Sequence, residues 1–326
     1  MTALERAVCP LCGGTARRPV CVKFDLPIVS CRGCGLVLAD PRLPESELMK
    51  RYLSREFYNE YMALMCPSKE KYDSGLIRNH FHIPLSLLGN ASRPGARLLD
   101  VGSGAGFFLR AAAEVGWSGD GIEVSAALAA YGRQVLGVRI REETIETADI
   151  PPETYDAVVL LDVIEHVREP GEMLEKTARI LRPGGKLVVG TPDFRSLSRW
   201  ILGRNWAILS PAEHLFNFTS STLARMLEAA EFQVRGPVNI LVFNPDATHA
   251  RGTRRHRLWR DFHERLENNS AMRKIQSHEV RRVLRLADGH ETGVRATIGK
   301  RFLLRLYEGL RTVVNGDMLY ALAIKK

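Results

Sequence analysis

The spacing of hydrophobic and polar positions predicts most of the elements in the middle of this chain. Between residues 96 and 191, short apolar runs alternate with segments of helix length. Such alternation is typical of βαβ units, which build a mainly parallel sheet. The predicted strands are "ARLLDVG", "SGDGIEVS", "VRI", "YDAVVLLD" and "GKLVVGTP".

The pattern continues with a helix, two more strands and a long segment between those strands. "FTSSTLARMLEAAEF" predicts a helix capped by Thr219 or Ser220, and "FQVRGPVNILVF" and "DMLYALAIKK" predict strands. Residues 244–316 lie between these strands and predict amphipathic helices, with one apolar face through Leu258, Trp259, Phe262 and Leu266 and another through Phe302, Leu306, Leu310 and Val313.

These changes of pattern divide the chain into five parts. We expect a cysteine-rich module at 1–43, a helical cover at 44–92, an α/β core at 93–243, the helical insertion at 244–316 and a last core strand at 317–326. No apolar run is long enough to span a membrane, and the first residues do not read as a secretory signal. The predicted location is the cytoplasm.

Composition adds a charge asymmetry to this picture. The formal net charge is +9, and residues 251–285 hold eleven Arg or Lys against four Asp or Glu. A basic stretch of this kind suits nucleic acid, an anionic membrane surface or a phosphorylated substrate, and it equally suits a solvated helical face.

"LLDVGSGAGFFL" places three glycines between a buried-type strand and a helix, as a nucleotide-binding loop does. Asp100 precedes the loop and would repel a pyrophosphate, whereas it would attract a cationic ligand. S-adenosylmethionine carries a sulfonium and an ammonium group that resolve this conflict. Glu123 ends the next strand, nineteen residues after Gly104, where a carboxylate can bind ribose hydroxyls.

The motifs "LLDVGSGAGFFL", "GIEVS", "YDAVVLLDVIEHV" and "ILRPGGKLVVGTP" resemble, in order, those of class I S-adenosylmethionine-dependent methyltransferases. The resemblance implies a Rossmann-like seven-stranded α/β sheet whose last strand is antiparallel. It also implies which residues contact the cofactor: Asp100, Gly102, Gly104 and Glu123 at the loop, Glu143 and Thr144 near adenine, and Leu161 and Asp162 near the methionine moiety.

Two histidines are the candidate catalytic residues. His166 follows the fourth predicted strand, at the carboxyl end where open α/β sheets place their chemistry, and His214 follows in "SPAEHLFNFTSSTL". An imidazole can remove the proton of an acceptor hydroxyl. Trp200, Ile201, Trp206 and Ile208 precede His214, and they predict either an acceptor pocket or core packing.

"DVIEHV" also resembles a segment of ubiquinone-pathway O-methyltransferases in which acids and a histidine are associated with a divalent cation. That resemblance implies a cation at Asp162, Glu165 and His166. The same segment fits a packed helix start in methyltransferases that need no metal.

Two CxxC pairs separated by eighteen residues predict a tetrahedral site for structural Zn²⁺ at Cys9, Cys12, Cys31 and Cys34, which leaves Cys21 and Cys66 as spare thiols. A zinc ribbon joined to a methyltransferase core resembles zinc-ribbon methyltransferases of the same broad family. Four thiolates close the zinc shell, so the module is expected to be structural.

The sequence favours methylation of a small-molecule acceptor, which is a metabolite, a sugar or a lipid-linked molecule. The expected reaction is O-methylation by base-assisted in-line transfer. Two alternatives stay open. One is an RNA methyltransferase that uses the zinc ribbon and the basic insertion to bind RNA, and the other is a catalytically silent regulator that binds the cofactor. A membrane surface is a further candidate partner, and the oligomeric state is left open.

Overall fold

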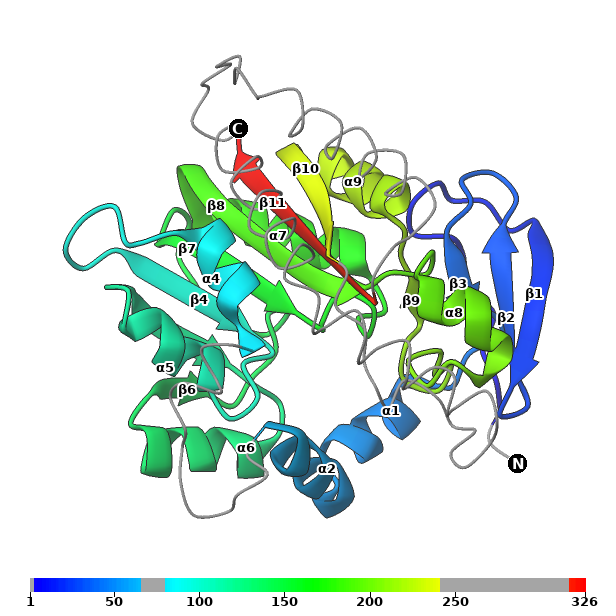
Figure 1. Cartoon of the computed structure of the whole chain (residues 1–326), viewed down its shortest axis with the longest axis horizontal. Helices are drawn as coiled ribbons and strands as arrows, with labels where there is room; N and C mark the ends of the chain where they lie inside the picture. The colour runs from blue at the N-terminus through cyan, green and yellow to red at the C-terminus, as the bar shows by residue number, and fades with distance from the viewer. Residues whose placement is uncertain (1–2, 66–79, 241–316) are drawn as a thin grey trace, which may run out of the picture.

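The computed structural model describes residues 3–65, 80–240 and 317–326 (Figure 1). A seven-stranded sheet forms its centre, with the strand order β10-β11-β8-β7-β4-β5-β6. The strands are β4 (Arg97–Val101), β5 (Ser118–Ile122), β6 (Arg139–Arg141), β7 (Tyr155–Leu161), β8 (Leu181–Pro192), β10 (Phe232–Ile240) and β11 (Met318–Lys325).

Neighbouring strands from β8 to β6 are parallel, and β11 pairs antiparallel with both β8 and β10. This is the mainly parallel sheet with an antiparallel last strand that the sequence implied, and the predicted fold class is confirmed. The predicted helix before β10 is also confirmed, with Thr219 as its N-cap: the Thr219 hydroxyl accepts a hydrogen bond from the Thr222 amide.

Helices cover both faces of the sheet. The helices around it are α4 (His82–Leu88), α5 (Phe107–Ala113), α6 (Ala126–Tyr131) with the π-helical turn η1 (Gly132–Leu136), α7 (Pro170–Ile180) and α9 (Ser220–Ala229). Adjacent residues of β4 point to opposite faces, so Leu98 packs in the cluster of α4, α5 and α6, while Leu99 packs with α7 and α9. The result is a three-layer α/β core.

A second sheet of four strands lies beside this core, with the order β1-β2-β3-β9 (Figure 1). Its strands are β1 (Arg17–Lys23), β2 (Leu26–Cys31), β3 (Val37–Ala39) and β9 (Phe216–Asn217). The first three belong to the cysteine-rich module, but β9 comes from the segment after β8. The sequence did not predict this strand.

Four further helical segments complete the description. They are α1 (Glu45–Tyr52), α2 (Arg55–Met65), α8 (Leu197–Leu202) and the 3₁₀ turn η2 (Gly203–Asn205). Helices α1 and α2 form part of the predicted cover. The domain limits remain a prediction, and the insertion at 244–316, with both of its apolar faces, and Cys66 lie outside the described residues.

Candidate cofactor and acceptor site

The glycine loop leaves the carboxyl end of β4 in a backbone conformation that favours glycine. Gly102, Gly104 and Gly106 have φ angles of +68°, +53° and +80°. The amides of Gly102 and Ser103 donate to the Ile122 carbonyl, at 2.9 and 3.0 Å. The loop is therefore held against β5, between the strand and the helix where the sequence predicted a glycine turn.

We expect Gly104→Ala to abolish most cofactor binding. A Cβ atom at this position would collide with the Tyr61 ring, and the positive φ would strain any residue other than glycine. The measurement is calorimetric titration with S-adenosylhomocysteine, for which we expect a loss of affinity of at least roughly tenfold. Gly137→Ala is the matched control, because Gly137 also has a positive φ but its Cβ would meet no atom within 4 Å. Equal losses in both variants would contradict a specific role for the loop.

Glu123 braces this loop from the end of β5. Its Oε2 accepts a hydrogen bond from the Gly104 amide and its Oε1 one from the Ser125 amide, both at 2.8 Å. Burial raises the pKa of Glu123, although these hydrogen bonds oppose the rise. The carboxylate predicted to bind ribose therefore also fixes the loop.

Asp100 lies at the end of β4 and is 3% exposed. Burial, and then the nearby charge of Glu123, raise its pKa well above the ordinary value. Within the described residues, neither carboxylate has an ion pair with Arg or Lys. Two buried acids without a counter-charge are suited to a cationic ligand.

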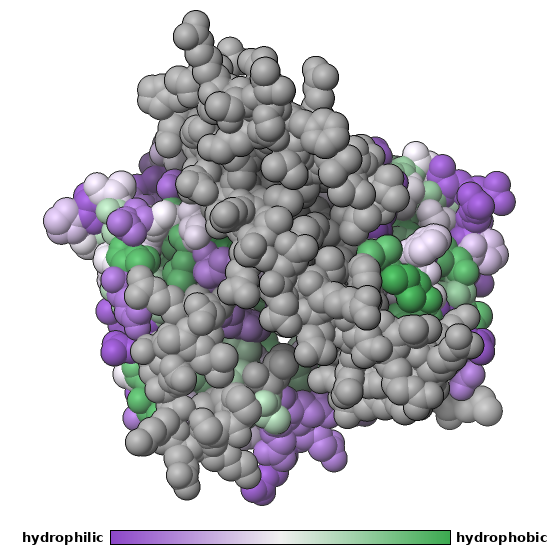
Figure 2. Space-filling view, in the orientation of Figure 1, coloured by the Kyte–Doolittle hydropathy of each residue, from purple (hydrophilic) through white to green (hydrophobic). Residues whose placement is uncertain are grey.

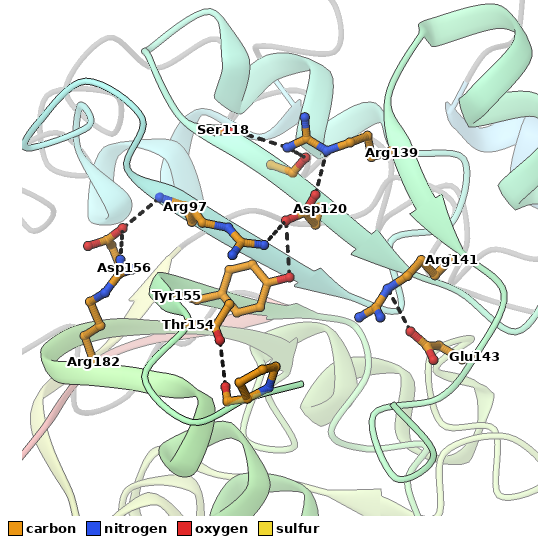
Figure 3. Close-up of polar contacts among 12 residues, drawn as sticks. Arg97, Ser118, Asp120, Arg139, Arg141, Glu143, Thr154, Tyr155, Asp156 and Arg182 are labelled. Carbon is orange, nitrogen blue, oxygen red and sulfur yellow. Dashed lines mark hydrogen bonds and ion pairs between the residues drawn. The ribbon is translucent and has the colours of Figure 1, made fainter. Parts of the chain in front are cut away.

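Two aspartates of the same sheet that lie away from the glycine loop have arginine partners and lowered pKa values (Figure 3). Asp120 accepts hydrogen bonds from Arg139 and Arg97, at 2.6 and 2.9 Å. Although burial opposes it, these arginines lower the pKa of Asp120. Asp156 has the same arrangement with Arg182 as an ion-pair partner. The raised pKa values of Asp100 and Glu123 are thus a local property of the candidate site.

Tyr61 reaches into the loop from α2, although sequence reasoning assigned it no role. Its hydroxyl accepts a hydrogen bond from the Ala105 amide at 3.4 Å, and its ring stacks with Phe107, with centroids 6.5 Å apart. Burial, and then the charges of Asp100 and Glu123 among others, raise its pKa. The sequence predicted a helical cover in this region, but only the tertiary structure shows which tyrosine reaches the loop.

The other predicted cofactor residues are spread along the sheet edge. Leu161 ends β7, and Asp162 follows with a φ of +54° and a pKa raised by burial to about 6. Glu143 pairs with Arg141 at 2.8 Å (Figure 3), and Thr144 exchanges hydrogen bonds with Thr147. The roles of all four residues at the cofactor remain predictions.

The two predicted catalytic histidines lie side by side. The ring centroids of His166 and His214 are 4.6 Å apart, with the rings at 80°. Burial lowers the pKa of both side chains, that of His214 to about 4, and the charge of His214 further lowers that of His166. Both imidazoles are therefore neutral at neutral pH, so each offers a lone pair.

The partners of His166 determine which nitrogen carries that lone pair. Nδ1 lies 3.0 Å from the Glu213 carbonyl oxygen and 2.7 Å from the Tyr52 hydroxyl. Because a carbonyl can only accept, we assign the proton to Nδ1, with the Glu213 carbonyl and the Tyr52 hydroxyl as its acceptors, which leaves the lone pair on Nε2. Arg51, next to Tyr52, pairs with the Glu213 carboxylate at 2.8 Å. Helix α1 and the 210–214 segment thus orient Nε2, which sequence reasoning missed.

Glu165 faces the two histidines with an unsatisfied oxygen. Its side chain is 1% exposed, and Oε2 accepts a hydrogen bond from the Thr191 hydroxyl at 2.9 Å. Oε1 has no hydrogen-bond partner and lies 3.9 Å from Nε2 of His166. Ligand atoms of Glu165, His166 and His214 lie within 4.8 Å of one another. The structure thus differs from the predicted cation set, because His214 takes the place given to Asp162.

The tryptophans before His214 do not line a common pocket. Trp206 is fully buried, and its indole N–H donates to Asp317 at 3.2 Å. Trp200 is 79% exposed on α8, near which Figure 2 shows apolar atoms at the surface. The core-packing interpretation holds for Trp206, and the predicted acceptor pocket does not include both rings.

The four cysteines predicted to bind zinc converge in the N-terminal module. Their sulfur atoms lie within 4.8 Å of one another, with 3.4 Å between Cys9 and Cys34 and 3.5 Å between Cys12 and Cys31. Thiolates about 2.3 Å from a tetrahedral zinc ion are about 3.8 Å apart, so the cluster has nearly the size of a zinc site. Cys21 lies on β1, outside this cluster.

Comparison with known proteins agrees with this geometry. A family model described as a methyltransferase domain matches residues 72–235, half of the chain. A ubiquinone biosynthesis O-methyltransferase of Idiomarina loihiensis is 33% identical over 166 residues, which cover 46% of this chain and 67% of that protein. One from Bradyrhizobium sp. is 34% identical over 117 residues, which cover 34% of this chain and 42% of that protein.

The fold is also found among solved structures. A SAM-dependent methyltransferase from Archaeoglobus fulgidus superimposes with a TM-score of 0.50 at 16% identity, covering 83% of this chain and all of that one. The sheet order, the glycine loop with its two buried acids and the match over half of the sequence agree. The chain belongs to the methyltransferase domain family and is an S-adenosylmethionine-dependent methyltransferase.

Proposed function

We propose that this methyltransferase transfers the methyl group to a hydroxyl oxygen of a small-molecule acceptor. The observation that carries the proposal is the orientation of His166, whose Nδ1 is tied to the Glu213 carbonyl so that Nε2 presents its lone pair. This lone pair lies at the carboxyl edge of the sheet, where α/β folds bind ligands. The names of the relatives, ubiquinone biosynthesis O-methyltransferases, support an oxygen acceptor.

The residues have separate tasks in this proposal. Asp100 binds the ammonium group of S-adenosylmethionine, and Glu123 fixes the loop and meets the ribose. Nε2 of His166 takes the hydroxyl proton while the oxygen attacks the methyl carbon in line with the departing sulfur. The C–S bond breaks as the O–C bond forms, and S-adenosylhomocysteine leaves with the bonding electrons. His214 lies against His166 and borders the acceptor.

The test is a methyl-transfer screen with isotopically labelled S-adenosylmethionine. The acceptors are phenols, nucleotide-linked sugars and prenylated ring compounds, with total RNA as a separate arm. Label on a hydroxyl oxygen supports the proposal, and label only on nitrogen, carbon or RNA contradicts it. The RNA interpretation depended on the basic insertion, which lies outside the described residues.

Zinc at Cys9, Cys12, Cys31 and Cys34 is part of the proposal, and its support is the convergence of the four sulfurs. Gly14 and Gly33 let the chain approach closely, because a Cβ at either position would lie 3.3 Å from the Cys12 sulfur. Zinc in this closed shell would stabilise the module and take no part in the chemistry. Among the described helices, none is long and apolar enough to cross a membrane, and the cytoplasmic location remains a prediction.

A divalent cation is a second way to activate the acceptor hydroxyl, and the unsatisfied Oε1 of Glu165 favours it. Two neutral imidazoles and one carboxylate suit a transition-metal ion, which lowers the pKa of a bound hydroxyl. We expect Glu165→Gln to weaken Mn²⁺ binding at least roughly tenfold. Calorimetry measures this, with Asp162→Asn as the control that should bind normally. An equal loss of Mn²⁺ affinity in Asp162→Asn would favour the ligand set with Asp162 that the sequence implied. If the unsubstituted protein binds no Mn²⁺, the cation proposal is wrong.

A further inference from the structure

The cysteine module shares a strand with the acceptor side of the enzyme. In β3, Val37 pairs with Asn217 and Leu38 with Phe216, so β9 is the fourth strand of the module's sheet (Figure 1). The Ala39 amide also donates to the Leu215 carbonyl at 3.0 Å. The chain reaches this pairing directly after His214. The module therefore fixes the backbone that carries a candidate active-site histidine.

A second set of contacts joins the module to the same segment. The ammonium group of Lys23, at the end of β1, donates to the Trp206 carbonyl at 2.5 Å. Lys23 is 8% exposed, and burial lowers its pKa to about 8. A buried lysine that loses its acceptor is costly, so this contact resists separation of β1 from the 206–214 segment. Beyond that segment, Arg225 of α9 donates to the carbonyl of Cys34 at 3.2 Å.

The module also shares its core with the methyltransferase. Cys9, Cys31 and Leu38 pack in the same cluster of buried residues as Phe216 and Phe218, together with Leu160 of the large sheet. Ile122 belongs to this cluster too, but the glycine loop is held by hydrogen bonds with Ile122 and Glu123, and no hydrogen bond of the described residues joins either of them to the module. Disturbing the module should therefore affect the acceptor side and spare the cofactor side.

We propose that the zinc-binding module is a positioning element of the acceptor site, which holds Glu213 and His214 in place through β9 and the Lys23–Trp206 contact. Because the Glu213 carbonyl fixes the proton of His166, the same contacts orient its Nε2. This inference rests on the proposed zinc site and on the proposed roles of the two histidines. In this proposal the module is part of the architecture of the acceptor site. A module that served only to bind nucleic acid would not be needed to position that site.

Hydrogen exchange read by mass spectrometry tests the proposal on the full chain. In Cys12→Ser, and after zinc is removed with a chelator, amides of residues 206–219 should exchange at least roughly tenfold faster. Affinity for S-adenosylhomocysteine should stay within about twofold. Val22→Ser is the control, since it also introduces a serine into the module, at an exposed position of β1 outside the cysteine cluster, and it should exchange like the unsubstituted protein. Native exchange rates in 206–219 after zinc loss would overturn the proposal.

Lys23→Met provides a second test that leaves the four cysteines intact, in case Cys12→Ser unfolds the whole protein and loses cofactor binding. It should raise exchange in 206–214, and Lys23→Arg should restore it. With an acceptor from the methyl-transfer screen, Lys23→Met should raise the acceptor KM and lower kcat without changing the cofactor Kd. Unchanged exchange and kinetics in Lys23→Met would refute the coupling. If the screen finds no oxygen acceptor, the proposed function fails while the exchange result still decides this inference.

Discussion

Replacing His166 with alanine is expected to lower kcat about 100- to 10,000-fold, the usual contribution of a general base. Affinity for S-adenosylhomocysteine should be unchanged, because the loop and its two acids lie on β4 and β5, whereas His166 follows β7. The measurement combines steady-state kinetics on an acceptor from the screen with calorimetric cofactor titration. An unaltered kcat would remove His166 from the chemistry.

Two additions separate a chemical role for His166 from a structural one. Free imidazole in the assay should restore part of the lost turnover, because it can occupy the vacated space and accept the proton, whereas it cannot repair a collapsed site. His82→Ala is the control, since His82 is an exposed residue at the start of α4. It should retain full turnover. Loss of activity without rescue, together with weakened cofactor binding, would indicate misfolding.

Asp100→Asn is expected to weaken S-adenosylmethionine binding by about 1.5 to 3 kcal/mol, roughly 10- to 150-fold, as loss of a charged hydrogen bond should. The ligand-free protein should not lose stability, because the substitution removes a buried charge that repels Glu123. Calorimetry measures the affinity and denaturant unfolding the stability. Unchanged affinity would show that Asp100 does not meet the cofactor.

Asp120→Asn is the matched control for Asp100→Asn. Asp120 is also an aspartate of the central sheet, but it pairs with Arg97 and Arg139 (Figure 3). Its substitution should lower the free energy of unfolding and leave cofactor affinity unchanged. Asp100→Asn should therefore lower cofactor affinity and spare stability, whereas Asp120→Asn should lower stability and spare cofactor affinity.

The raised pKa of Asp100 also gives cofactor binding a pH dependence. A protonated carboxyl cannot pair with an ammonium group, so the cofactor selects the ionised form and binding releases protons. Affinity should therefore rise with pH until the raised pKa of the free protein is passed, and then level off. Glu123 and Asp162, whose pKa values burial also raises, contribute in the same direction. Calorimetry in buffers of different ionisation enthalpy counts the released protons, and Asp100→Asn should release fewer.

The fold could be predicted from the local sequence pattern because each core strand and helix is marked by residues within or next to it. The apolar run of β4, the glycines after it and the cap at Thr219 are all determined by neighbouring residues. The grouping of the four cysteines could be predicted for the same reason, since the spacing within each CxxC pair is a local property. What the pattern could not predict was β9, a strand of two residues that exists only because β3 lies beside it.

The sequence indicated candidate residues of the site but not the contacts among them. Asp100, Glu123 and His166 were identified from their positions at the ends of predicted strands and His214 as a second histidine, and their roles remain predictions. Tyr52 and Tyr61 lie in the predicted helical cover and were given no role, because their contacts with His166 and the glycine loop join residues 114 and 44 positions apart. The pairing of His166 with His214 likewise depends on tertiary structure.

The place of β11 in the large sheet affects how the protein can be made. β11 contains residues 318–325, yet it lies between β8 and β10 and bonds to both. In a nascent chain that stops before Met318, the position of β11 is empty, and the edges of β8 and β10 that would pair with it are exposed. Such open strand edges pair with other chains. Termination before Met318 should therefore yield aggregates in place of an active enzyme.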